Sequence, residues 1–366
     1  MTESPADRWR VEPPPGMAAD TLTVAPPSIE AAAEVLEWAS AAGRRVLPRG
    51  GGTHMGPVGG DSPDVVVVTS ALNRVVDWQP EDLTLVVEGG ALVSEVEATL
   101  AERRQSAVLA EHTAGSTIGG MIAAGVSGYR RLRYGPTRDR MLEVTLATGD
   151  GRVITAGGRV VKNVTGYDIP RLVCGSEGSL GVIGRVCLKL WPVPESSASL
   201  TVDDVATFAG LYRPLALLET ESGITAYVAG TPEEVAAQAQ AVGATPRPGL
   251  DWPAPLEEAN QIELRVPPVL VGAAVAQVRE AGAKAFRAQH RVGIVAAGFG
   301  DWSAPRLDGL RLWAEGNGGA AVVLAAESAA VDRWGAPPGS LELQRRVKEA
   351  FDPLRVMVPG RLPGGL

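Results

Sequence analysis

The sequence predicts an α+β fold built from a glycine-rich N-terminal domain and a smaller α+β module. Strand-like apolar runs alternate with helix-like periods along the 366 residues. Three glycine-rich segments fall within one block of about 150 residues, which is the size of a typical domain. Beyond residue 195 glycine loops thin out and alanine becomes more frequent. We expect an N-terminal arm (1–20), the glycine-rich domain (21–195), the α+β module (196–338) and a segment that returns to the first domain (339–366).

The composition is that of an ordinary soluble globular protein, with 45% hydrophobic and 21% charged residues. The net charge of −8 is spread along the chain, which argues against a nucleic-acid partner because such a partner needs a basic face. No apolar run approaches the length that crosses a bilayer, and residues 1–19 contain no secretory pattern. We expect a cytoplasmic protein that meets a membrane only through partners. Cys174 and Cys187 lie in apolar surroundings and indicate buried thiols rather than a disulfide.

The chain begins with a β-α-β pattern that leads into the first glycine-rich segment. We expect a strand over 22–24, a helix over 29–42 that Ser28 caps and Gly43 ends, and a strand over 44–47. Residues 48–56, Pro-Arg-Gly-Gly-Gly-Thr-His-Met-Gly, follow directly.

Glycines in this position allow positive φ angles and close approach of a ligand to the backbone. Such a turn directs successive N–H groups into one concavity, which suits a phosphate. A flexible surface turn is the alternative, and the segment alone does not decide between the two. A Rossmann turn is excluded, because the segment follows the second strand and its spacing does not complete G-x-G-x-x-G.

The rest of the first domain predicts a second set of strands. A continuous apolar run over 64–69 indicates a strand buried on both faces. Further expected elements are a hairpin over 75–78 and 83–88, a helix over 92–104, a hairpin over 143–148 and 152–156, and a strand over 182–190.

Two more glycine-rich segments lie among these elements. In residues 113–125 small residues dominate, and Ser116 or Thr117 could cap a short helix whose N-terminus offers N–H groups to an anion. Tight helix packing alone is the alternative explanation. The third segment, residues 175–181, leads straight into a strand.

The module over 196–338 alternates strands and helices, which predicts a sheet covered on one side by helices. We expect strands over 224–229, 262–266, 292–297 and 320–326, and helices over 231–243, 269–281 and 305–315. The helix over 231–243 opens with a capping box at Thr231. Gly316–Ala321 has the letters of G-x-G-x-x-A, but a helix precedes it, so we interpret it as a connection. A tail helix over 341–351 should fold back on the first domain.

Several kinds of catalytic site are missing from the sequence. There is no P-loop and no G-x-S-x-G elbow, and the three histidines, His54, His112 and His290, lack paired metal spacing. We therefore expect no metal site. His112 and His290 are interpreted as structural, whereas His54 ends the first glycine-rich segment and is placed to approach the ring system of a cofactor. Three glycine-rich segments together suit an extended ligand that contains a diphosphate.

Several segments of the sequence resemble a known protein family. Pro48–Thr53 resembles the pyrophosphate loop of the FAD-binding domain in the vanillyl-alcohol oxidase and p-cresol methylhydroxylase (PCMH) superfamily, and Thr117–Gly120 and Gly175–Ile183 resemble its second and third flavin segments. Lys162–Asp168 resembles the FAD-binding E subunit of bacterial glycolate oxidase. Residues 351–353 and 359–361 are similar to that family's C-terminal signature. The likeness covers about residues 20–195 and 341–362.

The resemblance implies a PCMH-type FAD-binding domain of two α/β subdomains with a smaller α+β cap, and FAD bound non-covalently. Arg49–Thr53 would give N–H groups to the pyrophosphate, the second segment would line the pyrophosphate and flavin side, and the third would lie near the ribose or adenine. The implied cofactor-binding residues are Arg49, Gly50, Gly51, Gly52, Thr53, His54, Thr113, Ser116, Thr117, Gly119, Gly120, Glu177, Gly181 and Ile183.

Three functions follow from the resemblance. The first is an FAD-binding oxidoreductase subunit of a glycolate (2-hydroxy-acid) oxidase or dehydrogenase, whose partners are catalytic and iron–sulfur subunits. The second is a stand-alone FAD-dependent alcohol oxidase or dehydrogenase, and the third is a non-catalytic assembly subunit. Catalytic relatives carry a histidine cluster in the cap and C-terminal parts, where this chain has only His290, and this favours the first or third. A substrate carboxylate needs an arginine fork, for which Arg133 and Arg138 are the candidates, with solvated surface charge as the alternative.

Overall fold

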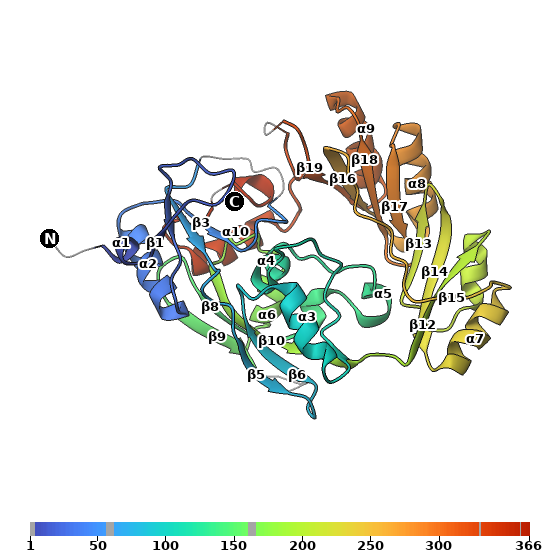
Figure 1. Ribbon diagram of the computed structural model, residues 1–366. Coiled ribbons are helices and arrows are strands. Elements are labelled where there is room, and N and C mark those ends of the chain that lie inside the picture. The colour runs from blue at the N-terminus through green and yellow to red at the C-terminus, as the bar shows by residue number, and fades with distance from the viewer. Residues whose placement is uncertain (1–3, 56–61, 160–165, 329–330, 359) are drawn as a thin grey trace.

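The computed structural model describes residues 4–55, 62–159, 166–328, 331–358 and 360–366. It forms two lobes, one built from the N-terminal half with the C-terminal tail, and one built from the module (Figure 1). Two sheets form the first lobe and an eight-stranded sheet forms the second. Of the helices in these residues, none combines the length and apolar character that spanning a membrane requires.

The first sheet of the N-terminal lobe contains the predicted β-α-β unit. Its order is β1-β2-β4-β3, and β2, β4 and β3 run parallel. The elements are β2 (Leu22–Val24), α2 (Ile29–Ala41), β3 (Val46–Arg49) and β4 (Val65–Val68). The hydroxyl of Ser28 accepts from the N–H of Ala31, which is the predicted cap.

The N-terminal arm, expected to be loose over residues 1–20, is ordered over residues 5–11. Residues 5–11 form a short helix, α1 (Pro5–Arg8), and a strand, β1 (Arg10–Val11), which pairs antiparallel with β2. Ala6 is fully buried against the first sheet's core. A polar, proline-rich sequence does not favour a strand by itself. β1 forms because β2 offers unpaired backbone groups at the edge of the sheet.

The second sheet is antiparallel, in the order β5-β6-β10-β8-β9. Both predicted hairpins are present, and the strands are β5 (Val75–Gln79), β6 (Thr84–Glu88), β8 (Met141–Ala147), β9 (Val153–Gly157) and β10 (Val182–Lys189). The helices of this lobe are α3 (Val93–Ala101), α4 (Ile118–Ala123), α5 (Arg131–Tyr134) and α6 (Ile169–Val173), with a 3₁₀ turn η1 (Thr137–Asp139). The helix predicted over 92–104 ends at Ala101, and Arg104 has a φ of 52°, in the left-handed region.

The module carries the eight-stranded sheet β15-β12-β14-β13-β17-β18-β16-β19. Its strands are β12 (Ser196–Val202), β13 (Ala216–Thr220), β14 (Gly223–Gly230), β15 (Arg247–Pro248), β16 (Asn260–Arg265), β17 (Ala285–Gln289), β18 (Ile294–Phe299) and β19 (Ala320–Ala325). Its helices are η2 (Val205–Gly210), α7 (Pro232–Ala241), η3 (Pro268–Leu270), α8 (Val271–Glu280) and α9 (Ala304–Gly316). β7 (Gln105–Ser106) and β11 (Trp191–Pro192) form a separate short pair that leads into it.

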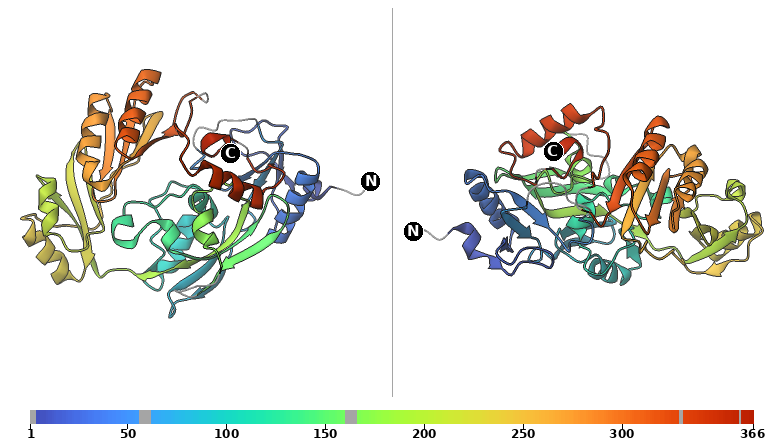
Figure 2. Two further views of the ribbon diagram at one scale, coloured as in Figure 1. Left: turned by 180° about the vertical axis from the view of Figure 1, so that it is seen from behind. Right: turned by 90° about the horizontal axis from the view of Figure 1, so that it is seen from above.

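Helices α7, α8 and α9 cover one face of this sheet, as predicted (Figures 1 and 2). The capping box at Thr231 is formed. Strands β12, β13, β15 and β17 were not predicted, because they are short or carry small polar residues. The other face packs on the N-terminal lobe through Tyr129 and Tyr134, which contact buried residues of β13 and β14.

The tail returns to the N-terminal lobe, as predicted. Helix α10 (Leu341–Phe351) is followed by a parallel bridge between Val46 and Met357. The buried ammonium of Lys348 donates to the carbonyl oxygens of Ser179, at 2.9 Å, and Met357, at 2.7 Å. A final 3₁₀ turn is η4 (Pro363–Gly365). Pro359 of the tail motif and residues 162–165 of the Lys162–Asp168 motif lie outside the described residues.

Candidate functional site

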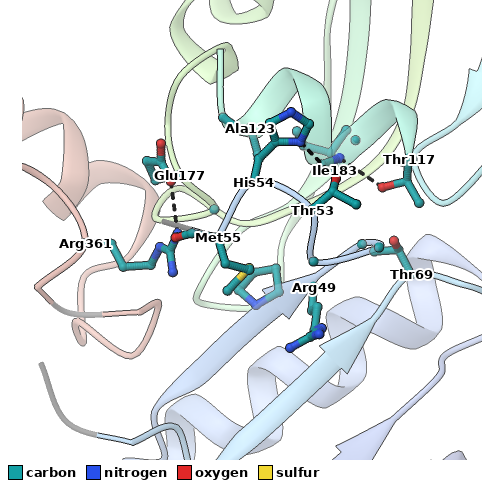
Figure 3. Close-up of a pocket in the computed structure, with 18 of the residues that line it drawn as sticks. Arg49, Thr53, His54, Met55, Thr69, Thr117, Ala123, Glu177, Ile183 and Arg361 are labelled. Atoms are coloured by element: carbon teal, nitrogen blue, oxygen red, sulfur yellow. Dashed lines mark hydrogen bonds and ion pairs between the residues drawn. The ribbon is translucent and has the colours of Figure 1, made fainter. Parts of the chain in front are cut away.

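The three glycine-rich segments, far apart in sequence, line one cavity of the N-terminal lobe (Figure 3). The first comes from the loop after β3, the second from the start of α4, and the third from the loop before β10. The predicted residues that line this cavity are Arg49, Gly50, Gly51, Gly52, Thr53, His54, Thr117, Gly119, Gly120, Glu177, Gly181 and Ile183. The geometry thus brings together the segments that the sequence singled out.

Four predicted site residues do not line the cavity. Ser116 is buried, with its Oγ 3.0 Å from Thr53 Oγ1, and Thr113 precedes Ser116 on the same loop. Arg133 donates from Nη1 to the carbonyl oxygen of Ala229 at 2.7 Å, which ties the two lobes together. Arg138 is exposed. The structure therefore gives Arg133 a contact between lobes and leaves Arg138 at the surface.

Glycines in the first loop are required partly by packing against the second loop. A Cβ on Gly50 would collide with Oγ1 of Thr117, and a Cβ on Gly51 would collide with the carbonyl oxygen of Gly115. Gly52 has a φ of +76°, which side chains rarely adopt. Sequence reasoning attributed these glycines to ligand approach, whereas two of them let the segments approach each other.

The first loop leaves a run of donors without protein acceptors. The N–H groups of Gly51 through Met55 donate to no backbone or side-chain acceptor within the described part of the chain. Consecutive free N–H groups beside a cavity are the arrangement that binds phosphate oxygens in proteins. These residues therefore fit a ligand that contains a diphosphate.

The start of α4 does not supply such donors, so the expectation that this helix N-terminus binds an anion is wrong. The N–H groups of Ile118 and Gly119 donate to the carbonyl oxygens of Ala91 and Gly89, at 3.0 and 2.6 Å. The N–H of Gly120 donates to Thr117 Oγ1, so Thr117 rather than Ser116 caps the helix. Tight packing, the alternative explanation of this segment, is what the structure shows.

The third segment contributes a buried carboxylate to the edge of the cavity. Glu177 has a φ of +53° and forms ion pairs at 3.0 Å with Arg333 of the module and Arg361 of the tail. Its carboxylate is thus held by two guanidinium groups from other parts of the chain. The role implied for Glu177, at the ribose or adenine, stays a prediction.

His54 reaches the cavity from the end of the first loop, and its Nδ1 lies 2.9 Å from Thr53 Oγ1. Burial lowers the pKa of His54 below 6.5, and the nearby charge of Glu177 only partly opposes this. The imidazole is therefore neutral at pH 7. A neutral ring suits contact with an uncharged part of a ligand.

The other two histidines and the cysteines are paired or buried elsewhere. His112 Nδ1 lies 3.7 Å from Glu97, and His290 Nε2 lies 3.0 Å from Glu219. Burial raises the pKa of both Cys174 and Cys187 to about 11, so neither thiol ionises at neutral pH. Among the described residues, no group of three potential ligands is arranged to hold a metal ion.

Sequence reasoning missed several residues that line the cavity. Arg361 belongs to the tail motif, which was interpreted only as a family signature, and Thr69 ends the predicted strand over 64–69. Met55 and Gly178 lie inside the glycine-rich segments themselves. The basic residue at the end of the returning tail was the one signal that could have pointed to Arg361.

Comparison with known proteins identifies the cofactor. Residues 21–157 match the family described as FAD binding domain. Glycolate oxidase subunit GlcD of Bacillus subtilis is 34% identical over 183 residues, which cover 48% of this chain and 38% of that protein. Glycolate oxidase subunit GlcE of Escherichia coli is 36% identical over 146 residues, which cover 39% of this chain and 41% of that protein. The matched stretches thus span less than half the length of these relatives.

A solved structure shows the same fold over almost the whole chain. Xylooligosaccharide oxidase from Myceliophthora thermophila, in complex with xylobiose, superimposes with a TM-score of 0.69 at 14% identity, over 92% of this chain and 90% of that one. The predicted resemblance to PCMH-type FAD-binding proteins and to glycolate oxidase subunits is confirmed. The cofactor of this chain is FAD, and the cavity with its free N–H groups fits it.

Proposed function

We propose that this FAD-binding chain is a subunit of a 2-hydroxy-acid oxidase or dehydrogenase of the glycolate oxidase type, and that it turns over substrate together with partner subunits. Bound FAD supplies the redox chemistry, as an acceptor of two electrons from the α-carbon of the acid or from a partner that oxidises it. The observation that carries the proposal is the single cavity that three separated segments line inside an FAD-binding domain.

The substrate class is supported by the names of the relatives. Both relatives described above are called glycolate oxidase subunits, and further relatives are called D-lactate dehydrogenase and D-2-hydroxyglutarate dehydrogenase. These matches cover about half of this chain or less, and the residues that match the FAD binding domain are 21–157, so the comparisons support FAD chemistry more strongly than one substrate. Glycolate is therefore the first substrate to test rather than the only one.

The dependence on partners is supported by the side chains of the module. Its one histidine, His290, has its Nε2 3.0 Å from the carboxylate of Glu219 and packs against Phe208. An imidazole held in this way on the helix-covered part of the module is poorly placed to take a proton from a substrate. The chain's own residues would then bind and orient the cofactor, while a partner completes the reaction centre.

One purification tests the proposal. The chain is purified alone and after co-expression with the products of neighbouring genes, and flavin absorbance is followed under anaerobic conditions after glycolate is added. We expect a yellow protein that glycolate does not bleach alone and does bleach in the presence of partners. Rapid bleaching of the chain alone would show a stand-alone enzyme, and a colourless chain that ignores added FAD would show an assembly subunit.

A further inference from the structure

A buried cluster of three charged side chains lies at the edge of the FAD cavity. Glu177 comes from the third glycine-rich segment, Arg333 from the end of the module and Arg361 from the tail. The side chains of Glu177 and Arg361 are each 4% exposed, and that of Arg333 is 12% exposed. One carboxylate faces two guanidinium groups, so the cluster carries a net positive charge in a place where water is largely excluded.

Arg361 is the member of this cluster that lines the cavity (Figure 3). Its Nη2 donates to Glu177 Oε2 at 3.0 Å and to the carbonyl oxygen of Met55 at 2.7 Å. Met55 ends the loop whose N–H groups are free. The guanidinium is therefore fixed to the same loop that is suited to a phosphate.

The rest of this guanidinium lacks acceptors. The Nε and Nη1 atoms of Arg361 are buried and have no hydrogen-bond partner among the described residues. A guanidinium has five N–H donors, and the Nη2 contacts use the two on that nitrogen. Buried donors without acceptors are costly to a fold, and more so when they carry charge. Arg361 lines the cavity, so a ligand bound there can supply the acceptor that the described residues do not provide.

The charge distribution of FAD indicates which of its groups accepts these hydrogen bonds. Its adenosine and oxidised flavin are uncharged, and its diphosphate carries the negative charge. A guanidinium donates charged hydrogen bonds to phosphate oxygens, and Nε and Nη1 are the nitrogens of Arg361 left to do so. We propose that Arg361 binds the diphosphate of FAD, opposite the free N–H groups of the loop, and that Glu177 holds the guanidinium in place.

Three variants test this assignment without any substrate, so its failure is separate from failure of the proposed reaction. Arg361→Met removes the charge and keeps the length, and Arg361→Lys keeps the charge but loses the Nε and Nη1 donors of the guanidinium. Arg333→Met is the matched control, because it removes a guanidinium from the same carboxylate without touching the cavity. Each protein is stripped of flavin and titrated with FAD, and the midpoint potential of the bound flavin is measured.

We expect Arg361→Met to weaken FAD binding by about 10- to 100-fold, the loss of one or two charged hydrogen bonds. Arg361→Lys should fall between this variant and wild type. Arg333→Met should stay within about threefold of wild type, because Arg333 is not among the residues that line the cavity. The midpoint potential should not change, because a contact with the diphosphate stabilises oxidised and reduced flavin equally.

The proposal is overturned if Arg361→Met binds FAD within threefold of wild type. It is also overturned if Arg333→Met loses as much affinity, since the cluster would then only join the lobes, or if the potential shifts together with the affinity, since the contact would then be with the flavin ring. Thermal unfolding of the flavin-free proteins shows whether each variant folds. Should Arg361→Met not fold, wild-type affinity in a folded Arg361→Lys would overturn the proposal.

Discussion

Replacing Gly51 with alanine tests whether contact between the first and second glycine-rich segments shapes the FAD site. A methyl group on Gly51 would overlap the carbonyl oxygen of Gly115 and lie 2.7 Å from its carbonyl carbon. Carbon atoms in ordinary contact lie about 3.5–4.0 Å apart. The first loop must therefore move by about 1 Å relative to the second.

This displacement should weaken the cofactor site more than the fold. Extra methyl groups in tightly packed positions cost about 1–3 kcal/mol, and part of that cost can be relieved by moving the exposed loop. Since the free N–H groups of residues 51–55 belong to this loop, we expect the dissociation constant of FAD to rise about 10- to 100-fold. The midpoint of thermal unfolding without FAD should fall only slightly.

The assay is a titration of flavin-free protein with FAD, followed by flavin fluorescence and by thermal unfolding with and without the cofactor. Gly272→Ala is the matched control, because Gly272 is an exposed residue of α8 with open space around the position of a Cβ. It should bind FAD normally and be slightly stabilised. Normal FAD affinity in Gly51→Ala would refute the view that the fit between the two segments forms the site.

Three further predictions concern stability, pH and the lobe contact. Lys348→Met leaves the fully buried carboxylate of Asp352 without its ion-pair partner at 2.6 Å and should lower the free energy of unfolding by about 3–5 kcal/mol in urea. Arg355→Ala, which breaks an exposed pair with Glu349, should cost less than about 1 kcal/mol; equal losses would contradict the assignment of Lys348 as the anchor of the tail. Because the pKa of His54 in the folded protein lies below 6.5, its contribution to stability is present above pH 6.5 and is lost as the pH falls toward the folded pKa. His54→Gln should therefore lose less stability than wild type between pH 7.5 and 5.5, and parallel losses would show that His54 is not responsible. Arg133→Ala removes the contact with Ala229 and should lower the free energy of unfolding by about 1 kcal/mol while FAD affinity is unchanged. An increase in KM at normal stability would instead indicate that Arg133 binds the substrate.

Local patterns were sufficient to predict much of the fold. Ser28 and Thr231 cap their helices as expected, since a cap depends on residues only three positions away. The continuous apolar run over 65–68 became a parallel strand buried between two neighbours. The glycine-rich segments were recognised for a similar reason, because the pattern of glycine and small residues in each lies within a few consecutive positions.

Contacts between distant parts of the chain could not be predicted in this way. Glu177 meets Arg333 and Arg361 across 156 and 184 residues, and no local pattern predicts that these three side chains meet. The packing role of Gly51 depends on Gly115, which the sequence cannot place beside it. The donors at the start of α4 were expected to be free, but Ala91 and Gly89 supply carbonyl acceptors from another loop.

The most direct test of the account is an experimental structure of the chain with FAD bound. We expect the diphosphate to lie against the N–H groups of Gly51–Met55, within reach of the Arg361 guanidinium, with residues 117–120 and 177–183 lining the same ligand. FAD bound elsewhere, or in contact with only one of the three segments, would contradict it.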